Sequence, residues 1–171
     1  MISPAYCQMM ARYGAWQNHS HAAAMAKLTE LQLLQERGAF FGSIQATANH
    51  LLWGDWLWMS RFDGGAPPEG GIASSGTLTS SLGDWAKQRK AMDARIAAWA
   101  QGLTQADVDG DLVFHSKMLG REMREPKSMC ITHFFNHQTH HRGQIHAMLT
   151  AAGVDPGDSD LFLMPKDTPW L

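Results

Sequence analysis

The sequence of 171 residues contains only two cysteines, Cys7 and Cys130, and no long apolar run. Two cysteines cannot form a disulfide framework, so we expect a reducing, cytoplasmic location. No apolar segment approaches the roughly 20 residues that a membrane-spanning helix needs, and the first residues lack the basic and apolar regions of a signal peptide. The 14 Lys and Arg residues are scattered and the formal net charge is −2. We therefore expect neither a nucleic acid nor a membrane as a partner.

Glutamate is also scarce, and the whole chain has only Glu30, Glu36, Glu69, Glu122 and Glu125. None of them lies in the second or fourth of the long helices predicted below. This argues against a di-iron carboxylate bundle, which needs glutamates on its core helices. The metalloprotease motif His-Glu-x-x-His, the haem-attachment motif, the glycine-rich phosphate loops and the Gly-x-Ser-x-Gly nucleophile motif are absent as well.

Apolar residues make up 44% of the chain and charged residues 18%, which is typical of a globular protein. The length fits one domain, so we expect a single domain over residues 1–171. Apolar residues recur at intervals of three and four, which predicts four long helices: residues 4–27, 39–62, 82–102 and 127–152. Four such helices without a strand-rich half predict an all-α protein with the architecture of a four-helix bundle.

The segments between these helices carry turn signals. Residues 29–38 predict a connector with a short helical turn that ends at Gly38. Residues 63–79 are rich in glycine, proline and serine, which predicts a long loop. Residues 112–116 and 121–124 flank a turn and could pair as a small β-hairpin before the last helix. The tail, residues 157–171, is expected to wrap the bundle.

The segment 133–146 contains five of the nine histidines. His133, His137 and His141 are spaced by four residues, so they share one face of a helix. Two neutral imidazoles at this spacing can hold one divalent metal ion. The spacing alone leaves open whether His137 pairs with His141 or with His133.

A third ligand has to come from another helix, since catalytic metal sites usually take three protein ligands. His50 is the best candidate because it lies mid-helix among apolar neighbours, although a hydrogen-bonded core histidine would give the same pattern. His140 and His146 lie off the shared face and are expected to point elsewhere or to support the ligands. In the first helix, His19 and His21 are expected near solvent.

Two stretches resemble the DinB family of damage-inducible bacterial proteins: Asn49-His50-Leu-Leu-Trp-Gly-Asp-Trp and His137-Gln-Thr-His-His141-Arg-Gly-Gln. The resemblance covers nearly the whole chain. It implies a four-helix bundle, often a homodimer, in which three histidines hold a metal ion. On this sequence the three ligands fall on His50, His137 and His141, so the resemblance favours His141 over His133 as the partner of His137.

The resemblance further implies a metal-dependent hydrolase, or a transferase that uses a low-molecular-weight thiol, acting on a small-molecule substrate. Zinc and nickel both suit three imidazoles. No general base is assigned. Two alternatives stay open: a non-catalytic metal-binding stress protein, in which His133 or Cys130 would close the coordination, and a purely structural bundle without a metal.

Overall fold

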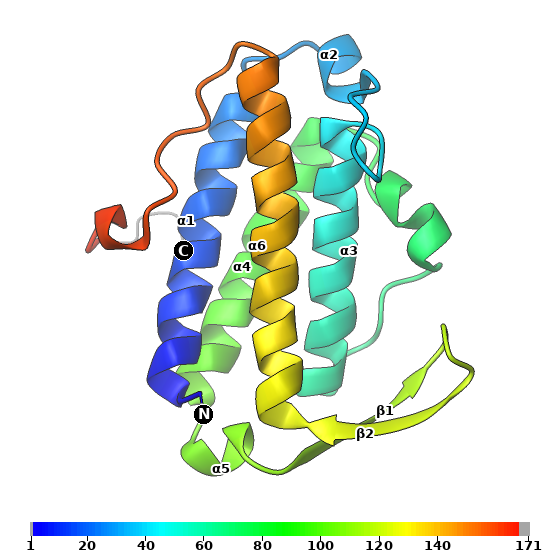
Figure 1. The fold of residues 1–171 in the computed structure, drawn as a ribbon, viewed down its shortest axis with the longest axis vertical. Helices are drawn as coiled ribbons and strands as arrows, with labels where there is room; N and C mark the ends of the chain where they lie inside the picture. The colour runs from blue at the N-terminus through cyan, green and yellow to red at the C-terminus, as the bar shows by residue number, and fades with distance from the viewer. Residues whose placement is uncertain (1, 168–171) are drawn as a thin grey trace.

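Four long helices form the body of the protein, as the computed structural model of residues 2–167 shows (Figure 1). They are α1 (Pro4–Met25), α3 (Ile44–Phe62), α4 (Leu82–Gly102) and α6 (Lys127–Ala151). Helix α1 packs on α4 and α6, and α3 packs on the same two helices, so α1 and α3 are diagonal in the bundle. The predicted all-α four-helix bundle is therefore confirmed. Among the described residues, none of the helices is long and apolar enough to cross a membrane.

Short elements connect these helices. Helix α2 (Glu30–Leu34) follows α1, the 3-10 helix η1 (Ile72–Thr77) precedes α4, helix α5 (Gln105–Val108) follows α4, and the 3-10 helix η2 (Leu161–Leu163) lies in the tail. Strands β1 (Asp111–Ser116) and β2 (Arg121–Pro126) pair antiparallel, with Phe114 opposite Met123. The predicted hairpin is thus confirmed, and it feeds directly into α6 at the lower end of the bundle (Figure 1).

Serine caps fix the starts of three long helices, because a serine side chain satisfies a free N–H of the first turn. Ser3, Ser43 and Ser81 each accept a hydrogen bond from the third residue beyond them. The predicted start of the second long helix at residue 39 was wrong, since α3 begins at Ile44. Gly42 has a φ of +80°, which lies outside the right-handed helical region, so a helix cannot run through this residue. Gly42 also forms an isolated bridge with Ala39.

The segment 63–79 is only partly the irregular loop predicted for it. Its η1 turn packs against α3. Asn49 of α3 holds this segment, because its side-chain N–H groups donate to the carbonyl oxygens of Gly76 and Thr79 at 3.0 and 3.2 Å. The segment is therefore fixed beside the middle of α3, where it reaches His50.

Candidate metal centre

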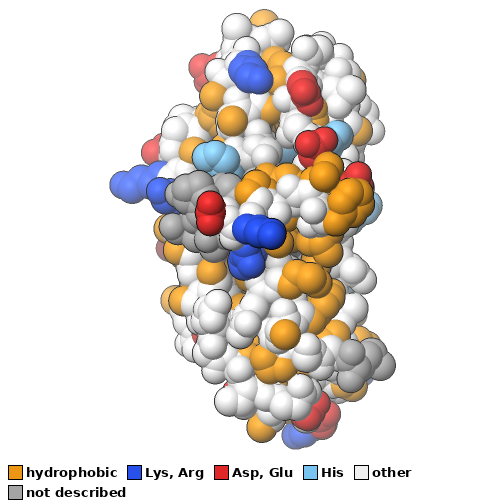
Figure 2. Space-filling model, turned by 90° about the vertical axis from the view of Figure 1, so that its left-hand side faces the viewer, with side chains coloured by type: hydrophobic (Ala, Val, Ile, Leu, Met, Phe, Trp, Pro, Cys, Tyr) orange, Lys and Arg blue, Asp and Glu red, His pale blue; other side chains and the backbone are white. Residues whose placement is uncertain are grey.

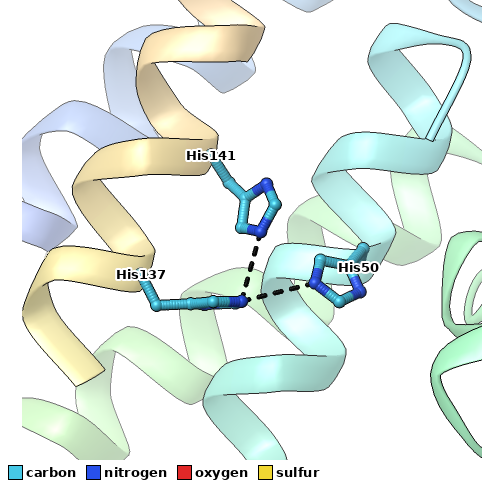
Figure 3. A group of neighbouring side chains, drawn as sticks. All are labelled: His50, His137 and His141. Carbon is cyan, nitrogen blue, oxygen red and sulfur yellow. Dashed lines mark hydrogen bonds between the residues drawn. The ribbon is translucent and has the colours of Figure 1, made fainter. Parts of the chain in front are cut away.

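Three histidine rings from two neighbouring helices meet at one point (Figure 3). His50 extends from α3, and His137 and His141 extend from successive turns of α6. Helices α3 and α6 pack side by side over their length, so their facing side chains can converge. The sequence predicted this set, and the structure brings all three residues together.

The distances between the ring nitrogens suit a single ion. Nε2 of His137 lies 3.3 Å from Nε2 of His50 and 3.2 Å from Nε2 of His141. One ligand nitrogen from each of the three rings lies within 4.8 Å of the other two. In a tetrahedral site with metal–nitrogen bonds of about 2.0–2.1 Å, two ligand nitrogens are roughly 3.3–3.4 Å apart. The three rings are therefore compatible with binding of a single divalent transition metal.

Ser75 sets the tautomer of His50. The Ser75 hydroxyl donates to the carbonyl oxygen of Ile72 at 2.6 Å, so its oxygen must accept from Nδ1–H of His50 at 2.8 Å. With the proton on Nδ1, the lone pair of His50 is on Nε2 and faces the other two rings. Hydrogen bonds of this kind orient metal-binding histidines in many proteins.

Gln144 does the same for His141. Its side-chain carbonyl oxygen Oε1 can only accept a hydrogen bond, and it lies 2.8 Å from Nδ1 of His141. The lone pair of His141 is therefore also on Nε2. An Nε2–H group on His137 can donate to both lone pairs, which explains the two short nitrogen–nitrogen distances.

All three rings favour the neutral form that binds metals. Burial first, and then the neighbouring His141, lowers the pKa of His50 to about 4. Burial and the surrounding histidines lower the pKa of His137 to about 3. Burial also lowers the pKa of His141, although the Gln144 hydrogen bond opposes this effect. At neutral pH none of the three has to lose a charge before it can ligate an ion.

The ring of His137 lies directly against the backbone of α3 at Gly54. A Cβ atom at this position would lie 2.8 Å from Cε1 of His137 and 3.4 Å from its Nδ1. A carbon–carbon contact normally needs about 3.5–4.0 Å, so only glycine leaves room for the ring. The sequence analysis missed this role, although Gly54 stands four residues after His50 and thus on the same face of the helix.

Aromatic side chains enclose His50. The Phe41 ring stacks on it with centroids 3.8 Å apart and an interplanar angle of 19°, and it also meets His141 edge-on at 5.7 Å. The Trp53 ring is nearly parallel to the His50 ring, with the two centroids 6.1 Å apart. Its indole N–H donates to the carbonyl oxygen of Glu69. Because Phe41 lies before α3, in the stretch wrongly predicted as helix, its position could not be inferred from periodicity.

The other candidate ligands lie outside this group. His133 is exposed, packs against Trp58 at a centroid distance of 5.1 Å, and reaches only within 5.9 Å of the His137 ring. Cys130 is buried, and burial raises the pKa of its thiol. Within residues 2–167, the histidine group contains neither of them. His140 is exposed, as expected for a residue off the shared face.

One histidine prediction was wrong. His19 is exposed as expected, but His21 is only 2% exposed. Its ring lies between α1 and α6, with its centroid 6.1 Å from that of His146. The periodicity of α1 did not reveal this, because several polar side chains of this helix face the interior.

A buried ionic network lies next to the histidines. Arg89 of α4 contacts Asp55 of α3 at 2.6 Å and Asp93 of its own helix at 2.8 Å. Asn18 of α1 donates to Asp93 at 2.8 Å, and Gln138 of α6 donates to Asp55 at 3.0 Å. All four helices are therefore joined by hydrogen bonds at the level of the site. Buried charges are stabilised by such pairing.

Comparison with known proteins agrees with this architecture. The sequence model of the DinB family matches residues 1–170. A crystal structure of a DinB-like protein from Bacillus cereus is similar over 84% of this chain and 90% of its own, with a TM-score of 0.61 and 22% sequence identity. At this identity the likeness concerns the fold. No curated protein matches the chain.

Proposed function

Since the chain belongs to the DinB family, we propose that it is a metal-dependent enzyme whose ion is held by His50, His137 and His141. The observation that supports this proposal is the convergence of three Nε2 atoms, two pairs of which are 3.2 and 3.3 Å apart. Zinc and nickel are the ions that fit a set of neutral imidazoles, whereas magnesium and calcium prefer oxygen ligands.

The proposed activity is hydrolysis, or transfer of a low-molecular-weight thiol, on a small electrophilic substrate. When bound, a divalent ion would lower the pKa of a coordinated water or thiol, so that hydroxide or thiolate is available near neutral pH. Ser75 and Gln144 hold the His50 and His141 rings in the tautomer that ligates. Phe41 stacks on the His50 ring and Trp53 lies nearby, so apolar surface borders the site, which limits access of water and favours a substrate with an apolar portion.

Metal analysis of protein purified without a histidine tag tests the ligand set. About one zinc or nickel ion per chain is expected in the unaltered protein and in His115→Ala, a control that removes an exposed histidine on β1. The His137→Ala protein should lose the ion, because its ring supplies the central nitrogen. Equal occupancy in His137→Ala and the control would refute the proposed site.

Hydrolysis and thiol transfer can be separated with cobalt-substituted protein. Cobalt(II) prefers the same ligands as zinc and has a visible spectrum that depends on coordination. If a thiol cosubstrate binds at the ion, adding cysteine or a related small thiol should produce a sulfur-to-cobalt absorption band, and should accelerate conjugation to an activated aryl halide. If hydrolysis is the activity, an activated ester should be cleaved without a thiol.

A non-catalytic metal-binding role is the alternative. It would be favoured if a fourth side chain closed the coordination. The histidine group of the described residues contains three ligands, and neither His133 nor Cys130 belongs to it, which favours a position left for water or substrate. A cobalt spectrum that no added thiol or small anion can change would instead support the non-catalytic role.

The expected homodimer is a further part of the proposal, and sedimentation equilibrium tests it.

A further inference from the structure

A pocket separate from the histidine group lies between α6, α1 and the C-terminal tail. Its volume is about 280 Å³. Most of its lining residues have polar side chains, among them Tyr13, Gln17, His21, Thr139, Arg142 and His146. Figure 2 shows the side of the molecule that carries α1 and this tail, where histidine and apolar side chains reach the surface.

The tail is tied across α1 at the edge of this pocket. The Tyr13 hydroxyl donates to the carbonyl oxygen of Ser159 at 2.7 Å, and the Gln17 amide donates to that of Asp158 at 2.8 Å. Both contacts use backbone oxygens of the tail. Ser159 also lines the pocket, so the tail forms part of its wall.

Arg142 is the charged residue of the pocket, and it is only 4% exposed. A guanidinium group has five N–H donors, yet within residues 2–167 Arg142 forms one hydrogen bond, a long contact of 3.4 Å from Nη1 to the Gln138 side-chain oxygen. The guanidinium carbon also lies 5.5 Å from the centroid of the Tyr13 ring. Nη2 is buried without a hydrogen-bond partner within residues 2–167. Burying a cation with so few partners is costly unless something else binds it.

The two buried carboxylates nearby do not supply that partner. Asp55 and Asp93 both form their ion pairs with Arg89. Gln138 stands between Arg142 and Asp55, because its amide donates to Asp55 while its oxygen accepts from Arg142. No ion pair within the described part of the chain joins Arg142 to a carboxylate, so its charge is balanced only at a distance.

A second unpartnered group points to the same pocket. His21 is 2% exposed, and its Nε2 atom is buried without a hydrogen-bond partner within residues 2–167. Burial, and then the charges of Arg142 and His146, lowers the pKa of its ring to about 3, so His21 is neutral at pH 7. Arg142 thus provides the one fixed positive charge of the lining, which matches a ligand with one negative charge.

We propose that this pocket binds a small organic acid through its carboxylate group, with the Arg142 guanidinium as the anchor. Arginine presents paired N–H groups that fit the two oxygens of a carboxylate. Tyr13 offers an aromatic wall, and His21 and His146 offer imidazole nitrogens for the rest of the ligand. The site does not depend on the metal centre, because residues 141 and 142 are about 100° apart around a helix and so face different neighbours.

Isothermal titration calorimetry on the full chain in the presence of EDTA tests the proposal. The probes are acetate, benzoate, the neutral analogue benzamide, and inorganic phosphate. Saturable binding of acetate or benzoate with one site per chain is expected, without measurable binding of benzamide. Binding of phosphate alone would overturn the proposal, because the ligand would not be a carboxylate. Failure of both carboxylates to bind at concentrations up to about 10 mM, the weak end of specific recognition, would also overturn it.

Variants locate the site. Arg142→Gln should weaken carboxylate binding about tenfold or more, because a charge-assisted pair is lost. Arg124→Gln, which removes one exposed charge on β2, is the matched control and should change the affinity less than about twofold. If Arg142→Gln does not fold, His146→Ala replaces it as the test variant, because His146 is only partly buried and its loss should disturb folding less. This variant should weaken carboxylate binding severalfold. Unchanged affinity in both pocket variants would refute the assignment. His137→Ala should bind the carboxylate normally even if it has lost its metal, so this test stands apart from the proposed enzyme function.

Discussion

Replacing Gly54 by alanine should weaken metal binding without unfolding the protein. The added Cβ would lie 2.8 Å from Cε1 of His137, whereas carbon atoms in contact are about 3.5–4.0 Å apart. The ring therefore has to move by at least roughly 0.7 Å, the difference between these values. Metal–ligand distances are held to within about 0.2 Å, so a shift of this size displaces Nε2 of His137 from its ligating position.

The expected loss of affinity is about 10- to 100-fold, which is the usual effect when the surroundings of a metal-binding histidine are disturbed. Stability should change much less. Overpacking a core position costs about 1–3 kcal/mol, while alanine in place of a helical glycine contributes about 0.5–1 kcal/mol in the other direction. The free energy of unfolding of the metal-free variant should thus fall by no more than about 2.5 kcal/mol.

Zinc affinity is measured by competition with a chromophoric chelator, and the free energy of unfolding by urea titration in EDTA. Gly143→Ala is the control, because Gly143 lies in α6 and a Cβ there would meet no atom within 4 Å. The control should keep the affinity of the unaltered protein. A dissociation constant of Gly54→Ala within about twofold of the control, well below the effect expected from a displaced ligand, would refute the geometric argument.

Three further outcomes are expected. In EDTA the protein should lose stability as the pH falls from about 6.5 toward 4. The pKa values of His50 and His137 are lowered in the folded protein, so the unfolded chain binds more protons in this range. Each ring should lower the free energy of unfolding by about 2 kcal/mol by pH 5, as urea titrations would show. Ser75→Ala should raise the zinc dissociation constant about tenfold, as the chelator competition would show, because His50 loses the acceptor that fixes its tautomer. Arg89→Gln should lower the free energy of unfolding by about 3–5 kcal/mol, since it leaves buried carboxylates unpaired, whereas Arg95→Gln, at a more exposed ion pair, should cost less than about 1 kcal/mol.

The long helices could be predicted from the sequence because their signals are local. Helices α1 and α4 begin at the predicted residues, where Ser3 and Ser81 cap them, and α6 ends within one residue of its predicted end, before Gly153 with its φ of +80°. The start of α3 was misplaced because Ala-Phe-Phe before Gly42 is apolar enough to resemble a helix. Only the backbone conformation of Gly42 and the cap at Ser43 set the boundary.

The residues of the candidate site also differ in whether their roles could be predicted from the sequence. The four-residue spacing of His133, His137 and His141 is a local property of one helix, and the position of His50 among apolar residues made it the best third candidate. The resemblance then favoured His141 over His133 as the partner of His137. The roles of Gly54 and Ser75 depend on how α3 meets α6 and η1, and no periodicity within either segment encodes such a meeting. Gln144 falls between these cases, because it lies three residues after His141 on the same helix, where a contact can be anticipated.

The misplaced His21 shows why the interior of this bundle is hard to infer. A helical pattern assigns polar residues to solvent, but here Asp55, Arg89 and Gln138 meet in the core. Asp55 stands five residues after His50, and Gln138 stands next to His137. Sliding α3 along α6 would therefore break the 3.0 Å contact between Gln138 and Asp55 as well as the 3.3 Å contact between His50 and His137. The buried polar contacts that confuse the sequence pattern are those that fix the register of the two helices, and hence the distances on which metal binding depends.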